Sequence, residues 1–244
     1  MPGYARRAHI KHKRPECKFL YGQRARNCTL TPVFRCRRAA WINSRARGLG
    51  VLITNDDQLR EASERVSVLI QEMQNYLGER NTEEGKIRFP YGFIRTANHF
   101  RMRVAFIDDQ TLRSNIAYTL ILSDVLRWAL NRMHVVGTAK EMLAKQIICV
   151  MGGVVESTTK HYLRGQVGAH AGYKVRTAKL AEMGAISQDL KNELEWLWDT
   201  RMNEHLFLVG EREYQRYSVR ESNRAVRAFR ALRDSLETHH ANAN

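Results

Sequence analysis

The chain has 244 residues, of which 43% are hydrophobic, and it carries a formal net charge of +15 at pH 7. This length suffices for one domain with extensions or for two small domains with real cores. No window approaches the roughly 18 consecutive apolar residues of a transmembrane helix, and no apolar stretch follows the basic N-terminus as in a secretory signal. The composition therefore argues against membrane-spanning and secreted classes.

The positive charge is concentrated in residues 1–50, which contain thirteen Arg or Lys residues and one acid, Glu16. Scattered Pro and Gly residues and the lack of a sustained hydrophobic period predict a largely irregular basic arm. Such an arm can neutralise phosphates and release condensed counterions, so we expect it to bind nucleic acid. An unstructured leader or an organelle transit peptide would have a similar composition. The candidate nucleic-acid-binding residues are Arg6, Arg7, Lys11, Lys13, Arg14, Arg35, Arg37 and Arg38.

The four cysteines have no closely spaced pair, which is typical of a reducing compartment, and we expect a cytoplasmic location. Cys149 lies in an apolar run and is expected in the core. We predict no metal or other cofactor. A zinc site is the alternative for the cysteines of the arm, with Cys17, Cys28, Cys36, His9 and His12 as the available ligands.

Residues 51–107 are predicted to contain one helix and a connecting segment. Asn55 and the two aspartates after it can cap a helix, and apolar residues then recur at helical spacing up to Leu77. Gly78 ends this helix, residues 79–92 form a polar loop, and residues 93–107 show no clear pattern.

Residues 108–238 are predicted to form an antiparallel bundle of four long helices with short connections. The predicted helices span residues 109–136, 138–163, 188–208 and 219–238, with a short helical piece at 177–183 and a tail at 239–244. Thr138 with Glu141, and Ser218 with Glu221, have the spacing of capping boxes. No convincing strand pattern occurs. The predicted fold class is therefore all-α, with an additional N-terminal helix and the basic arm.

The helix predicted at 188–208 breaks its own pattern. Its apolar stripe steps through positions 190, 194, 197, 201, 205 and 208, but Arg201 and His205 occupy two of them. Burying an unpaired charge there would cost several kcal/mol, so both side chains should face a partner, a cleft or an interface. Departures from local rules of this kind often mark functional sites.

The helix predicted at 138–163 contains a second break. Glu156 follows Gly152 and Gly153 in an apolar stretch, and Lys160 is one turn later. The two could form an ordinary (i, i+4) ion pair that stabilises the helix by a few tenths of a kcal/mol. Glu156 could instead pair with Arg201 across two helices.

These motifs resemble the HEPN superfamily of helical ribonuclease-like domains. Glu156 and Lys160 match an acid and a lysine on the second helix, and the run from Leu197 to Phe207 resembles the third-helix signature, in which Arg precedes His. The resemblance covers residues 109–238. Three residues separate Arg201 from His205, whereas many catalytic members have four to six.

The resemblance implies a metal-independent endoribonuclease whose paired third helices form one composite site in a homodimer. Cleavage of RNA through its 2′-hydroxyl needs proton transfer and a cation at the phosphorane, and an imidazole and a guanidinium suit these tasks. His205 would be the acid and base and Arg201 the phosphate clamp. Glu156 would orient Arg201, and Lys160 would add positive potential. RNA and a cognate antitoxin or defence-system protein are the implied partners.

Three alternatives remain at this stage. The domain could be a non-catalytic nucleic-acid-binding or assembly module with the same fold. It could be a helical interaction protein in which Glu156 and Arg201 form a structural ion pair. Or the chain could bind nucleic acid through the arm, with the helical bundle serving for dimerisation.

Overall fold

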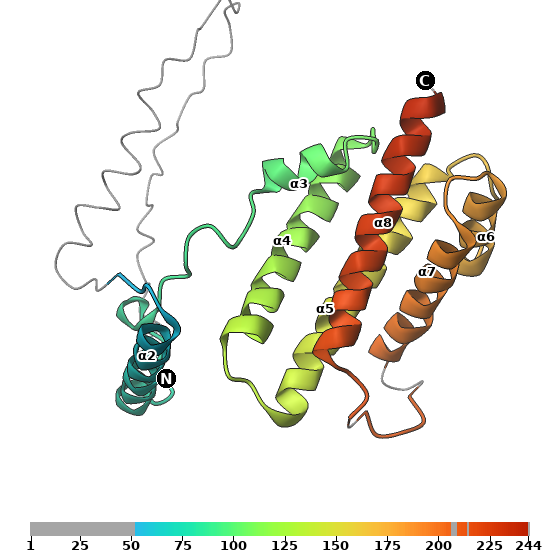
Figure 1. Cartoon of the computed structure of the whole chain (residues 1–244). Helices are drawn as coiled ribbons and strands as arrows, with labels where there is room; N and C mark the ends of the chain where they lie inside the picture. The colour runs from blue at the N-terminus through green and yellow to red at the C-terminus, as the bar shows by residue number, and fades with distance from the viewer. Residues whose placement is uncertain (1–51, 206–208, 214, 244) are drawn as a thin grey trace, which may run out of the picture. The chain divides into compact units, whose positions relative to one another are not determined.

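The computed structural model describes residues 52–205, 209–213 and 215–243, and every regular element in these ranges is a helix (Figure 1). The predicted all-α class is therefore confirmed for the described residues. The basic arm, with its candidate nucleic-acid-binding residues and the alternative zinc ligands, lies outside them. The chain divides into two compact units between Lys86 and Ile87.

The first unit contains α2 (Asp56–Leu77), the helix that the apolar stripe predicts. The side chain of Asn55 accepts a hydrogen bond of 2.9 Å from the backbone N–H of Gln58, as expected of a helix cap. Gly78 ends the helix with a φ of 56°, a conformation that favours glycine, and its N–H donates to the carbonyl of Gln74.

The second unit is built around one central helix. α5 packs against three other long helices, and α3 and α6 are added at the edges, against α4 and α7 (Figure 1). The helices are α3 (Ala97–Arg103), α4 (Gln110–Arg132), α5 (Gly137–Tyr162), α6 (Tyr173–Glu182), α7 (Gln188–Arg201) and α8 (Val219–Ala243). Among the helices of the described ranges, none has an apolar stretch long enough to cross a bilayer.

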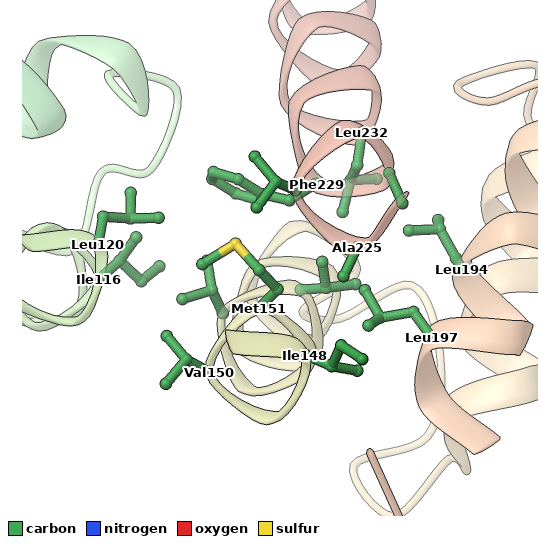
Figure 2. Close-up of a cluster of buried hydrophobic side chains, with 14 of the residues drawn as sticks. Ile116, Leu120, Ile148, Val150, Met151, Leu194, Leu197, Ala225, Phe229 and Leu232 are labelled. Atoms are coloured by element: carbon green, nitrogen blue, oxygen red, sulfur yellow. The ribbon is translucent and has the colours of Figure 1, made fainter. Parts of the chain in front are cut away.

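α5 occupies the centre because its apolar residues continue around the helix rather than forming one stripe. Figure 2 shows Met151 reaching toward Phe229 of α8 and Ile148 lying on the side of Leu197 of α7, while Val150 points elsewhere. The four long helices share this core. Its labelled members are Ile116, Leu120, Ile148, Val150, Met151, Leu194, Leu197, Ala225, Phe229 and Leu232.

One predicted capping box is present and the other is not. The N–H of Ser218 donates to Glu221 over 2.7 Å, and the N–H of Glu221 donates to the Ser218 hydroxyl over 3.3 Å. The box predicted at Thr138 is wrong: α5 begins one residue earlier, without a side-chain cap. Glu141 instead accepts a 2.7 Å hydrogen bond from the backbone N–H of Gln215.

Two predicted helix ends differ from the structure. α7 stops at Arg201 and is followed by the short 3₁₀ helix η3 (Met202–Glu204). The predicted α-helix over residues 188–208 is therefore wrong for residues 202–205. Residues 206–208 lie outside the described ranges. α8 continues to Ala243, so residues 239–243 are helical rather than a tail. The hydroxyl of Tyr162 anchors this end, 2.7 Å from Nδ1 of His239.

The helical domain also begins earlier than the predicted residue 108. Phe100, Val104 and Ile107 are buried in the same core as the four long helices. The guanidinium of Arg95 binds both carboxylate oxygens of the buried Asp124 on α4, at 2.6 and 3.0 Å. The unpatterned stretch at 93–107 therefore belongs to the second unit.

Candidate functional site

Glu156 on α5 and Arg201 at the end of α7 form an ion pair, with 3.0 Å between Oε2 and Nη1. Gly152, one turn before Glu156, makes this approach possible. A Cβ atom at Gly152 would lie 2.9 Å from Cβ and 2.8 Å from Cδ of Arg201, closer than real contacts allow. The missing side chain therefore lets the stem of Arg201 lie across α5. The interhelical pairing of Glu156 and Arg201, left open by the sequence, is observed.

A second arginine approaches the same carboxylate. Nη2 of Arg176, on α6, lies 4.0 Å from Oε1 of Glu156, and its Nη1 donates to the carbonyl of Ala171 over 2.6 Å. The side chain of Arg176 is only 8% exposed, and its Nε is buried with no hydrogen-bond partner in the structure. One carboxylate thus faces two guanidinium groups, which leaves one positive charge in excess.

An aromatic pair holds the two guanidinium groups in place. The rings of Tyr173 and Trp198 are stacked, with centroids 4.5 Å apart and planes inclined by 5°. Arg201 lies over Trp198 at 5.1 Å, and Arg176 lies over Tyr173 at 5.7 Å, both within the range of cation–π attraction. Burial raises the pKa of Tyr173, so this hydroxyl stays protonated and donates to the carbonyl of Leu194. The contacts form a closed ring through α5, α6 and α7.

His205 takes no part in the contacts of this ring. It follows η3, with φ −81° and ψ 87°, and its side chain is exposed. The sequence places His205 one helical turn after Arg201 on a single face, and that placement is wrong because α7 has already ended. The structure therefore brings Glu156 and Arg201 together but does not hold His205 on the same helical surface.

Lys160 has no ion pair with Glu156, although both residues are described. It lines a pocket of about 560 Å³, together with His161, Arg164 and Arg176. The imidazole of His161 is bound through Nε2 to Asp108 at 2.9 Å, while its Nδ1 is buried with no hydrogen-bond partner in the structure. We refer to this site, defined by Lys160, His161, Arg164 and Arg176, as the cationic pocket.

The cationic pocket adjoins a second depression of about 260 Å³ that contains Arg201 and Glu204. Leu112 on α4 and Ser157 on α5 line both hollows, so the two are adjacent, between α4 and the α6–α7 side of the domain. We refer to the two hollows together as the groove. Cys149 is on the floor of the second hollow. Burial raises the pKa of its thiol to about 11, so it is not a nucleophile at neutral pH.

Three residues of the contact ring were not predicted from the sequence. Tyr173 and Arg176 precede the short helix predicted at 177–183, so neither is assigned to a helical face. Trp198 lies in the run that resembles the third-helix signature, with no role assigned to it. The adjacent glycines in an apolar helix were a usable signal, because glycine there often marks a close approach by another segment.

Comparison with known proteins gives no match: no protein-family model, no curated protein and no solved structure is significantly similar to this chain.

Proposed function

We propose that this chain is a metal-independent endoribonuclease of HEPN type, in which α4, α5, α7 and α8 correspond to the family's four-helix bundle and two copies form one composite site. The observation that carries the proposal is the Glu156–Arg201 pair at the edge of a groove with a cationic pocket. A guanidinium held by a carboxylate and an aromatic face suits a phosphate group.

The RNA strand would lie along the groove, with backbone phosphates over Lys160 and Arg164 and the scissile phosphate near Arg201. A base removes the proton of the 2′-hydroxyl, the 2′-oxygen attacks phosphorus, and the 5′-oxygen leaves and takes up a proton. The products are a 2′,3′-cyclic phosphate and a 5′-hydroxyl. Arg201 stabilises the charge that develops on the phosphorane, and Glu156 keeps its guanidinium in place.

The exposed position of His205 is the reason that a second subunit enters the proposal. The reaction needs one proton acceptor and one proton donor, and an exposed imidazole beyond the end of α7 can reach across an interface between two copies. In a homodimer, one His205 would serve as the base and the other as the acid.

The test is cleavage of total RNA by the purified full chain in the presence of EDTA, with analysis of the new ends. We expect cyclic phosphate ends with the wild type and, for His205→Ala, a rate lower by about 100-fold or more, the usual contribution of general acid–base catalysis. His134→Ala removes another exposed histidine, between α4 and α5, and is the matched control. Equal rates for the two variants, or a strict need for a divalent ion, would contradict the mechanism.

A non-catalytic RNA-binding module with the same fold is the second candidate. It is favoured by the end of α7 at Arg201, which leaves His205 outside the helix that carries the guanidinium. This candidate predicts that the wild-type chain binds RNA, that Lys160→Gln weakens binding, and that no cyclic phosphate ends form at any protein concentration.

A further inference from the structure

A second concentration of positive charge lies between α3, α4 and α8. Five arginine side chains line one small hollow there, and we call them the arginine cluster: Arg95, Arg103, Arg127, Arg230 and Arg233. Met151 on α5 borders this hollow, whereas Val150 borders the groove described above, and Figure 2 shows these two side chains on different sides of α5. The cluster is therefore separate from the groove.

The acidic residues nearby do not balance this charge. Asp124 is bound by Arg95, and Asp234 is bound by Arg233. Within the described residues, no carboxylate lies within ion-pair distance of the other three arginines. Two carboxylates thus face five guanidinium groups, an excess of three positive charges in one place.

Of the three arginines without a carboxylate, Arg127 is partly buried, whereas Arg103 and Arg230 are exposed. Nε of Arg127 is buried and has no hydrogen-bond partner in the structure. Burial and the neighbouring charges of Arg127, Arg95 and Arg233 lower the pKa of Arg230. Both features indicate that the fold holds like charges close together at a cost in free energy. A bound anion would offset that cost.

The hollow is small, with about 30 Å³ open to the centres of water molecules. Its lining includes the apolar side chains of Phe100 and Leu120 and the buried Ser123. A tetrahedral anion at its mouth would lie among the guanidinium groups.

We propose that the arginine cluster is a phosphate-binding site distinct from the groove, and that it takes one phosphate group, either as the free inorganic ion or in the backbone of RNA. Arg127 and Arg230 are the principal ligands, because neither is engaged by a carboxylate and their charges act on each other. Arg103, which also lacks a carboxylate partner, adds positive potential. Arg95 and Arg233 keep their aspartate partners and add positive potential.

The experiment compares two double variants of the full chain that lose the same charge. Arg127→Gln with Arg230→Gln removes the two principal ligands of the cluster. Arg132→Gln with Arg227→Gln removes one exposed arginine from each of the same helices outside the hollow. Binding of inorganic phosphate and of a 12-nucleotide single-stranded RNA is measured by calorimetry. Thermal unfolding is followed in chloride and in phosphate at equal ionic strength.

We expect the cluster variant to bind phosphate at least 10-fold more weakly than the wild type, with a change of less than about 2-fold for the control. In chloride the cluster variant should unfold at the wild-type temperature or higher, because repulsion among like charges is reduced, whereas a purely structural role would lower that temperature. Weaker RNA binding with unchanged inorganic phosphate binding would identify the RNA backbone as the source. Equal losses of affinity in the two double variants, for inorganic phosphate and for RNA alike, would overturn the proposal. The RNA is 2′-O-methylated, so it cannot be cut through its 2′-hydroxyl, and the outcome is independent of the nuclease proposal.

Discussion

Replacement of Gly152 by alanine tests how Arg201 is positioned, and the neighbouring Gly153 provides the control. Both glycines lie inside α5, where alanine is favoured over glycine by roughly 0.5–1 kcal/mol. At Gly153 an added Cβ has no atom within 4 Å, so Gly153→Ala should raise the free energy of unfolding by about that amount.

At Gly152 the same methyl group would meet Cβ, Cγ and Cδ of Arg201 at 2.8–3.0 Å. Cβ of Arg201 is fixed to the backbone of α7, so a rotamer change cannot remove all three contacts. Overpacking of this kind typically costs about 1–3 kcal/mol, which exceeds the gain in helix propensity. We therefore expect Gly152→Ala to be less stable than Gly153→Ala by about 2 kcal/mol.

Thermal unfolding of both variants measures this difference, which corresponds to about 4–8 °C for a domain of this size. Gly152→Ala should also move the guanidinium away from Glu156 and so reduce RNA binding or cleavage. If Gly152→Ala is as stable as Gly153→Ala, the stem of Arg201 does not lie across α5, and the description of the site is wrong.

Three further changes to the chain have expected outcomes. Nζ of Lys145 lies 2.7 Å from a carboxylate oxygen of Glu213, and both side chains are nearly buried. Lys145→Met removes the charged partner of this carboxylate. It should lower the free energy of unfolding by about 3–5 kcal/mol in urea titrations at neutral pH. Burial alone would raise the pKa of Glu213, but Lys145 and the hydroxyl of Tyr217 lower it below the ordinary value of 4.5. The ionised Glu213 therefore stabilises the fold above pH 4.5, and this stabilisation is lost as the pH falls through the lower pKa of the folded state. Lys145→Met should weaken this loss of stability in acid. Tyr162→Phe should cost about 1 kcal/mol and speed proteolysis near His239, and unchanged proteolysis would show that the hydrogen bond does not hold the end of α8. Deletion of residues 1–50 should flatten the salt dependence of RNA affinity, whereas an unchanged slope would assign the phosphate contacts to the helical domain.

The long helices could be predicted from the sequence because each of them carries a sustained apolar pattern. α5 and α8 were placed within a few residues, and Cys149 was correctly expected in the core. α3 was missed because seven residues are too few to show a period, and its helix is stabilised by packing of Phe100 and by the contact between Arg95 and Asp124.

The end of α7 could not be predicted from the same kind of pattern. Leucine at position 208 continues the apolar stripe, but a stripe records which residues could face the core and not where the backbone stops being helical. Arg201, which looks misplaced in the stripe, is accommodated by an ion pair to Glu156 and by the space above Gly152, both on another helix. These contacts are tertiary interactions with another helix, so the periodicity of one helix cannot predict them.

Glu156 is shared by two arginines, and this has a consequence for ligand binding. In the structure Arg201 is close to the carboxylate at 3.0 Å, and Arg176 is more distant at 4.0 Å. An anion in the cationic pocket would draw Arg176 away, and Glu156 would then interact with Arg201 alone. An anion in the cationic pocket would thereby hold Arg201 more firmly against Glu156 and change the affinity of a ligand at Arg201. By thermodynamic reciprocity, a ligand at Arg201 would change the affinity of the cationic pocket for its anion by the same factor. A single side chain on α5 thus makes the two ends of the groove thermodynamically interdependent.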